Sequence, residues 1–220
     1  VYNFRELRAE LEPLGHRFAT HCDTEVVLHA FEEWGPQCFA RFNGMWGAAI
    51  LDRRGDRPRL VLARDHFGIK PLFYARSGGR VLFASEVKAI LQDPAFERRV
   101  NEQRMYEYLA YGFFDHDTST FFEGVSQVAP STYVQIDDSG ITQHRYWEPK
   151  WTGPWSRGTS FDEVARRFWK EFVKAVADHC RADVPLGVFL SGGVDSSSVA
   201  AAVCQYWPAK DVRTFSIGFE

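Results

Sequence analysis

The segment from residue 185 to residue 219 constrains the fold of this chain more than any other. The apolar run 185–190 predicts a buried strand, the alanine-rich stretch 196–207 predicts a helix, and 212–219 predicts a second strand. Two strands joined by a helix within about 30 residues form a βαβ unit, whose strands run parallel. We therefore expect an α/β doubly wound parallel sheet in this part of the chain.

The turn between the first of these strands and the helix reads Ser191-Gly192-Gly193-Val194-Asp195-Ser196-Ser197. Parallel sheets bind ligands at the carboxyl ends of their strands, and two glycines leave backbone N–H groups open to a close anion. The helix N-terminus and the serine hydroxyls add further donors. The turn predicts a phosphate cradle. It lacks the lysine of G-x-x-x-x-G-K-[ST] and does not match G-x-G-x-x-G, which disfavours Walker-type NTPases and dinucleotide enzymes.

Asp195 is unexpected in such a cradle, because its carboxylate would repel phosphate unless a divalent cation bridged the two. Magnesium prefers one or two carboxylates together with phosphate oxygens and water. The sequence therefore predicts that Asp195 binds Mg²⁺. The alternative is a tight turn in which Asp195 only caps the helix, and the residues alone leave it open.

The first 150 residues predict an α+β domain with antiparallel sheet. Two pairs of strand-like runs flank turn residues and predict hairpins, namely 72–76 with 80–85 and 132–136 with 141–146. Two helices are expected, one over 24–34 ended by Gly35-Pro36 and one capped by Asn101 and ended by Gly112. The apolar run 44–51 predicts either core packing or the wall of a passage.

A loop rich in proline and glycine over residues 148–160 predicts a domain linker. Ser160 and Glu163 then form a capping box before apolar residues at helical spacing, which predicts a long amphipathic helix. We therefore expect one domain over 1–147, a linker over 148–160, and the first part of a second domain over 161–220.

Composition excludes some classes of function. The 220 residues carry 26 basic and 29 acidic side chains, for a formal charge of -3. This balance argues against binding nucleic acid or acidic membranes. The four cysteines lack zinc-ligand spacing and predict free thiols in the cytoplasm. Neither a signal peptide nor a membrane span is expected. Because the chain opens on Val1 and closes on an apolar strand-like segment, we expect an internal fragment of a longer protein.

The string Ser191 to Ser196 resembles the SGGxDS signature of the PP-loop ATP pyrophosphatase superfamily. The resemblance implies that ATP is converted to AMP and pyrophosphate in order to adenylate a substrate. It places ATP contacts on Leu190, Ser191, Gly192, Gly193, Asp195, Ser196 and Ile217, with Mg²⁺ on Asp195. Core packing of Leu190 and Ile217 is compatible with this role.

Residues 1–147 resemble the glutaminase domain of the glutamine-hydrolysing asparagine synthetase family, which is related to N-terminal-nucleophile hydrolases. The matching strings are Val1-Tyr-Asn-Phe-Arg-Glu-Leu7, Asp23-Thr-Glu-Val26, Asn43-Gly-Met-Trp-Gly-Ala48, Arg64-Asp-His-Phe-Gly-Ile-Lys-Pro-Leu-Phe-Tyr74 and Phe83-Ala-Ser-Glu-Val-Lys-Ala-Ile90. The segment 183–193 extends the resemblance into the second half of the chain. An N-terminal-nucleophile-type α+β fold is therefore expected for the first domain.

This resemblance implies a nucleophilic cysteine upstream of Val1, so no catalytic residue is expected within the chain. It places the α-ammonium group of glutamine on Asp23; the alternative is that Asp23 only caps the helix that follows. Cys22 is interpreted as an ordinary thiol. The triplet 64–66 is interpreted as a turn, and the triplet 115–117 as a solvated loop without a metal.

The implied reaction converts aspartate, glutamine, ATP and water to asparagine, glutamate, AMP and pyrophosphate through β-aspartyl-AMP. The partners are then small molecules, with a homodimer expected from the family and with neither nucleic acid nor membrane. Two alternatives stay open: a related amidotransferase or β-lactam-synthetase-like enzyme acting on another carboxylate, and a non-catalytic nucleotide-binding paralogue. The 220 residues by themselves are expected to be inactive.

Overall fold

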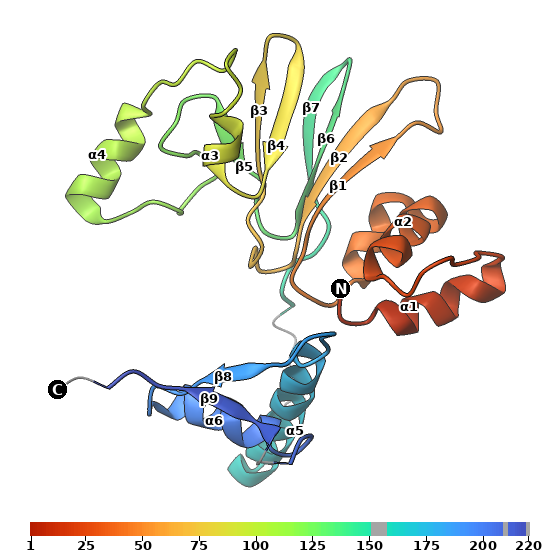
Figure 1. The fold of residues 1–220 in the computed structure, drawn as a ribbon, viewed down its shortest axis with the longest axis vertical. Helices are drawn as coiled ribbons and strands as arrows, with labels where there is room; N and C mark the ends of the chain where they lie inside the picture. The colour runs from red at the N-terminus through yellow and green to blue at the C-terminus, as the bar shows by residue number, and fades with distance from the viewer. Residues whose placement is uncertain (151–157, 209–210, 219–220) are drawn as a thin grey trace. The chain divides into compact units, whose positions relative to one another are not determined.

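A computed structural model describes residues 1–150, 158–208 and 211–218 (Figure 1). The chain contacts divide into two compact units: unit 1, which contains Asn3–Pro149 and Val1, and unit 2, which contains Lys150–Glu220. Most of the expected linker, residues 151–157, lies outside the described residues. None of the helices within the described residues has the length and apolar character needed to cross a membrane.

Unit 1 contains two antiparallel sheets. The first has the order β1-β2-β6-β7, formed by Gly47–Asp52, Arg59–Arg64, Thr132–Asp137 and Gly140–Arg145. The second has the order β4-β3-β5, formed by Arg80–Ala84, Phe73–Ser77 and Val125–Gln127. The pairings of β3 with β4 and of β6 with β7 confirm both predicted hairpins.

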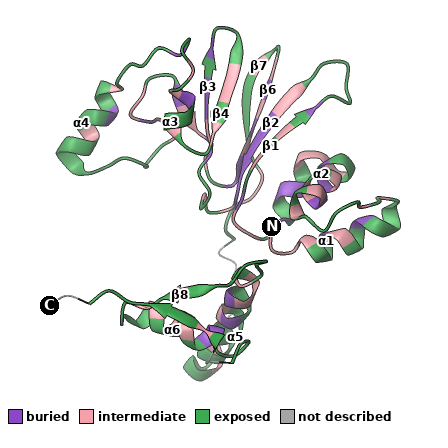
Figure 2. Cartoon of the chain, viewed as in Figure 1, coloured by how far each residue is buried: buried purple, intermediate pink, exposed green. Residues whose placement is uncertain are grey.

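The two sheets lie between helices in a layered arrangement (Figure 1). Helices α1 (Phe4–Leu11) and α2 (Asp23–Trp34) and the 3₁₀ helix η2 (Gly35–Arg41) share a core with Val61 and Ala63 of β2. Leu62, which lies between these two residues, contributes instead to a core with Leu72 and Tyr74. Consecutive side chains of a strand point to opposite faces, so β2 is buried on both sides. Figure 2 shows buried residues along the strands of these sheets.

Two short helices lie beside the second sheet, and the second of them begins and ends where the sequence predicts. Helix α3 covers Val87–Ile90 and α4 covers Glu102–Tyr111. The Asn101 side chain accepts a hydrogen bond from the Arg104 N–H, and Gly112 ends α4 in the left-handed region at φ 73°. The predicted cap and stop of this helix are confirmed.

Residues 115–117 form an exposed loop, as interpreted, and this loop also contacts a buried arginine. Arg104 is 1% exposed, and its guanidinium contacts His116 at 2.8 Å, pairs with Asp117 and lies 3.0 Å from a Glu107 carboxylate oxygen. A buried arginine requires nearby acceptors and counter-charge, which this loop supplies. These contacts could not be predicted from the sequence, because Arg104 and its partners in the loop are separated along the chain.

The predicted turn at Arg64-Asp65-His66 is confirmed, and it is held by buried charges. The Asp65 carboxylate is 0% exposed and accepts hydrogen bonds from four backbone N–H groups, those of Trp46, Phe67, Ile69 and Lys70. The Arg64 guanidinium donates to the carbonyls of Gly68, Lys70 and Val128. These two side chains fix the loop that leads from β2 into β3.

Unit 2 contains helices α5 (Phe161–His179) and α6 (Val194–Val203) and strands β8 (Gly187–Phe189) and β9 (Arg213–Phe215). The two strands pair in parallel with Val188 opposite Thr214, as the βαβ prediction requires. Both strands are shorter than predicted, and α6 begins at Val194 rather than at Ser196. The difference arises because Gly193, not a side-chain cap, occupies the N-cap of α6.

The core of unit 2 is small and joins α5 to α6 through Val173, Val176, Ala202 and Val203. The Ser160 hydroxyl accepts from the Glu163 N–H at 3.3 Å, which confirms the predicted cap of α5. Phe168, placed on the apolar stripe by its spacing, is 65% exposed. Helical spacing shows which residues share a side of a helix, but not how far a neighbouring element covers that side.

Candidate functional site

A cleft of about 1070 Å³ opens in unit 1 beside the start of α2. Its lining comes from three segments, namely 20–28 around the start of α2, 45–51 along β1, and 70–72 after the Asp65 loop. The apolar run 44–51 therefore contributes a wall of this cleft, and part of it also packs against the core of the first sheet. The cleft brings Asp23 together with backbone and side-chain groups of β1.

Asp23 is the first residue of α2, and the N-cap position belongs to Cys22, which makes no side-chain cap hydrogen bond. The alternative interpretation of Asp23 as the helix cap is therefore wrong. The Asp23 carboxylate instead accepts a hydrogen bond from the ammonium group of Val1 at 2.6 Å. Partial burial acts to raise the pKa of Asp23, but hydrogen bonding to that ammonium group and to the Cys22 thiol outweighs it and lowers the pKa.

Cys22 is exposed, and its Sγ atom lies 3.7 Å from an Asp23 carboxylate oxygen. A carboxylate is a poor activator of a thiol in this geometry, because negative charge disfavours the thiolate. The structure therefore places Cys22 as a neighbour of Asp23 and gives it no base.

Glu25 is a residue of this site that the sequence analysis missed. Its carboxylate accepts hydrogen bonds from the N–H groups of Ala19 and Thr20, both at 2.7 Å, and from the Thr20 hydroxyl. These bonds hold the segment before α2 against the first turn of the helix and lower the pKa of Glu25 to about 2. An acidic residue at the third position of a helix was the available signal.

The acid stability of unit 1 should depend on Glu25. Its pKa is about 2 in the folded chain against 4.5 normally, so its stabilising contribution is complete above pH 4.5 and is lost as the pH falls towards 2. We expect Glu25→Gln to lower the urea midpoint at pH 7 and to leave it nearly unchanged at pH 2. An equal loss at both values would contradict the assignment, and Glu10→Gln on the exposed surface of α1 serves as control.

The glycine turn of unit 2 forms a second candidate site at the carboxyl end of β8. The Ser196 hydroxyl accepts from the Ser191 N–H at 3.3 Å, lies 3.1 Å from the Ser191 hydroxyl, and donates to the Gly193 carbonyl at 3.2 Å. Gly192 adopts φ 81°, a conformation that favours glycine. The two serines thus hold the loop in one conformation. Because Gly192 and Gly193 have no side chains, their backbone is not covered by Cβ atoms.

Asp195 lies in the first turn of α6, where its side chain is exposed. Within the described parts of the chain, no hydrogen bond or ion pair engages its carboxylate. Leu190 and Ile217 follow the ends of β8 and β9, as predicted, and Ile217 is 86% exposed. The Ser216 hydroxyl donates to the Leu190 carbonyl at 2.7 Å and holds these two strand ends together. The glycine turn, the Asp195 carboxylate and the exposed Ile217 side chain therefore all lie at or near the carboxyl ends of β8 and β9.

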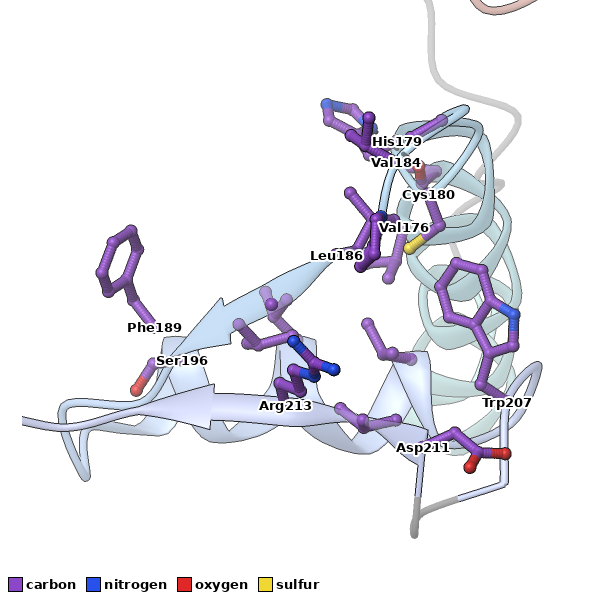
Figure 3. A pocket seen from close by; sticks show the side chains of 18 of the residues that line it. Val176, His179, Cys180, Val184, Leu186, Phe189, Ser196, Trp207, Asp211 and Arg213 are labelled. Atoms are coloured by element: carbon purple, nitrogen blue, oxygen red, sulfur yellow. Dashed lines mark hydrogen bonds between the residues drawn. The ribbon is translucent and has the colours of Figure 1, made fainter.

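A separate hollow of about 950 Å³ in unit 2 is largely apolar (Figure 3). Val176, Cys180 and Leu186 gather at one end of it, and Ser196 lies at the other (Figure 3). Ser196 is the only residue of the segment 191–196 that borders this hollow, so the hollow and the glycine turn are different features. Its lining is mostly apolar, with the polar side chains of His179, Ser196, Asp211 and Arg213 among the apolar ones.

Comparison with known families identifies the class. The profile described as "Glutamine amidotransferase domain" matches residues 1–147, and the profile described as "Asparagine synthase" matches residues 167–220. Since the first profile covers most of the chain, the chain belongs to the glutamine amidotransferase domain family.

Similar whole proteins carry more particular names. "Asparagine synthetase [glutamine-hydrolyzing] 3" of Bacillus subtilis is 34% identical over 223 residues, which cover 100% of this chain and 36% of that protein. "Putative asparagine synthetase [glutamine-hydrolyzing] 2" of Methanocaldococcus jannaschii is 31% identical over 100% of this chain and 42% of that protein. The chain thus spans about two fifths or less of these relatives.

Among solved structures, a glutamine phosphoribosylpyrophosphate amidotransferase of B. subtilis aligns with a TM-score of 0.46 and 18% identity, over 98% of this chain and 43% of that chain. The fold assignment rests on the observed topology, in which an α+β unit with antiparallel sheets precedes a parallel βαβ unit, as the sequence predicted.

Proposed function

We propose that this chain is part of an enzyme that makes asparagine from aspartate, glutamine and ATP. In this proposal residues 1–147 belong to a glutaminase domain, 148–160 link the domains, and 161–220 begin the ATP-binding domain of a cytoplasmic carbon–nitrogen ligase. The observation that carries this proposal is that one chain combines a cleft containing Asp23 in the amidotransferase part with a glycine turn at a helix N-terminus in the asparagine synthase part. The relatives' names support aspartate as the carboxylate.

Glutamine would bind in the unit 1 cleft with its α-ammonium group on Asp23. The position of Asp23 supports this, because its carboxylate lines the cleft at the first turn of α2. A partly buried carboxylate with a lowered pKa stays charged at neutral pH and forms a strong charge-assisted hydrogen bond. The cysteine that attacks the amide is expected upstream of residue 1.

ATP would bind at the glycine turn of unit 2, with its phosphates facing the backbone N–H groups of Gly192 and Gly193 and the first turn of α6. Free N–H groups and the helix dipole at that end favour anions. Adenine would lie against Leu190 and Ile217. Leu190 is partly buried and Ile217 is 86% exposed, so both leave apolar surface for a ligand. Adenylation gives the aspartate side chain a good leaving group, which ammonia then displaces.

Asp195 fits a magnesium site by its chemistry. Its carboxylate is exposed in the first turn of α6, at the helix end that attracts anions such as phosphate. Mg²⁺ favours carboxylate oxygens as ligands together with phosphate oxygens. Bound there, the ion would offset charge on the departing pyrophosphate. The chain's own groups would orient the triphosphate.

The test is to supply the enzyme that contains this chain with ATP, Mg²⁺, aspartate and glutamine and to identify the phosphate product. We expect AMP and pyrophosphate in amounts equal to asparagine. Orthophosphate and ADP would contradict the assignment of the glycine turn.

Replacing Asp23 should impair the use of glutamine alone. Asp23→Asn removes the charge that holds the α-ammonium group, so we expect the KM for glutamine to rise about 10- to 100-fold, the equivalent of one charge-assisted hydrogen bond. Synthesis from ammonium chloride should be unchanged, because free ammonia bypasses the cleft. Asp115→Asn, on the exposed surface of the same unit, is the matched control. An unchanged KM in Asp23→Asn would remove Asp23 from the glutamine site.

A further inference from the structure

Two imidazoles and three carboxylates gather along one face of α2, and one of these carboxylates is that of Glu25, which also holds Ala19 and Thr20. His29, Glu32 and Glu33 share one face of α2, since residues three and four apart on a helix are neighbours. His16, from the segment that follows the 3₁₀ helix Glu12–Leu14, reaches His29. The His16 and His29 side chains are only 10% and 20% exposed.

The distances within this group resemble those of ligands on one metal ion. His16 Nδ1 lies 3.0 Å from His29 Nδ1, and Glu32 Oε2 lies 3.9 Å and 3.5 Å from these two atoms. Tetrahedral zinc with metal–nitrogen bonds of about 2.0–2.1 Å requires ligand atoms about 3.3–3.4 Å apart. The three measured sides bracket that value, so small side-chain rotations bring all three atoms onto a common centre.

The outer nitrogen of each imidazole also faces a carboxylate. His16 Nε2 lies 3.0 Å from Glu33 Oε2, and His29 Nε2 lies 4.0 Å from Glu25 Oε1. Metal-bound histidines commonly donate their second N–H to a carboxylate, which fixes the tautomer and strengthens the ligand. With both imidazoles neutral, the three carboxylates leave the cluster net negative, which favours a cation.

The backbone holds this arrangement before any ion binds. Gly15 ends the 3₁₀ helix Glu12–Leu14 at φ 99°, a left-handed conformation that directs His16 toward α2. The His16 N–H donates to the carbonyl of Leu11, which is fully buried. The Phe18 ring packs edge-on against His29 with 4.7 Å between centroids. Because these contacts already hold His16 and His29 in place, binding of an ion would require little movement of the backbone.

We propose that His16, His29 and Glu32 bind one zinc ion, with Glu33 orienting the His16 imidazole. Glu32 is 55% exposed, so a fourth position faces solvent and suits water. The ion would tie the segment before α2 to the helix that carries Asp23, and so would stabilise unit 1. The site is independent of the proposed reaction.

The test is zinc binding to the metal-stripped protein by titration calorimetry at pH 7.5, with cobalt substitution as a spectroscopic probe. We expect one equivalent of zinc, a tetrahedral cobalt spectrum and a higher melting temperature with zinc. His29→Ala should abolish these three effects. Glu33→Gln, which changes no metal ligand and little shape, should weaken binding about 10- to 100-fold.

His21→Ala removes an exposed histidine just before α2 and should bind like the parent chain. If His29→Ala fails to fold, Glu33→Gln and Glu32→Gln decide the matter. Absence of binding at micromolar zinc, or equal binding by the His29, Glu32 and Glu33 variants and the parent, would overturn the proposal. Either result would leave the two imidazoles as a hydrogen-bonded pair.

Discussion

Asp195→Asn is expected to lower the rate of pyrophosphate release by about 100- to 1000-fold, the cost of losing one group that stabilises transition-state charge. The carboxylate is exposed and has no partner within the described residues, so its removal should barely change folding. The loss should appear with glutamine and with ammonium chloride alike, because both nitrogen sources need the adenylate. Raised magnesium should not restore the rate, since the amide is a weak ligand.

Asp211→Asn is the matched control for this experiment. Asp211 is an exposed aspartate of the same unit and borders the apolar hollow at a distance from Ser196 (Figure 3). Its variant should retain the parent rate. Full activity of Asp195→Asn would leave Asp195 as an ordinary acidic residue of a helix first turn and would remove the proposed magnesium ligand.

Asp65→Asn should lower the free energy of unfolding of unit 1 by about 2 to 6 kcal/mol, with no part in substrate binding. Each carboxylate oxygen of Asp65 accepts two backbone hydrogen bonds. An amide replaces one oxygen by a donor, so two buried or partly buried N–H groups lose their acceptor at about 1–3 kcal/mol each. The loop that these bonds hold also lines the cleft through Lys70, so the variant should be less stable before it is less active.

Urea unfolding of the parent and the variant measures this effect, with Asp56→Asn as control. Asp56 is exposed in the connection between β1 and β2, so its variant should stay within about 0.5 kcal/mol of the parent. Equal stability of Asp65→Asn and Asp56→Asn would contradict the structural role assigned to the buried carboxylate.

Local sequence signals predicted the local structure of this chain well. The hairpins around Gly78-Gly79 and Gly140, the Asn101 cap and the parallel pairing of β8 with β9 all depend on residues close in sequence. Element ends were less well predicted. The strands of unit 2 are shorter than their apolar runs, because apolar residues continue past the last paired position, as Ile217 does.

Contacts between distant residues could not be read from the sequence. Arg104 and Asp117 lie on different segments, and their pairing depends on how α4 meets the following loop. The cluster of His16 with His29 depends in the same way on the packing of α1 and α2. For the candidate sites, the sequence identified the glycine turn and Asp23, whereas the role of Glu25 emerged only from its contacts with Ala19 and Thr20.

The most direct test of the central claim follows isotopes through one turnover of the enzyme that contains this chain. Aspartate labelled with ¹⁸O in its side-chain carboxylate and glutamine labelled with ¹⁵N in its amide are supplied with ATP and Mg²⁺. If the carboxylate attacks ATP and ammonia displaces AMP, mass spectrometry should find one ¹⁸O atom in AMP and ¹⁵N in the amide of asparagine. Unlabelled AMP, or ¹⁸O in orthophosphate, would contradict adenylation at the glycine turn.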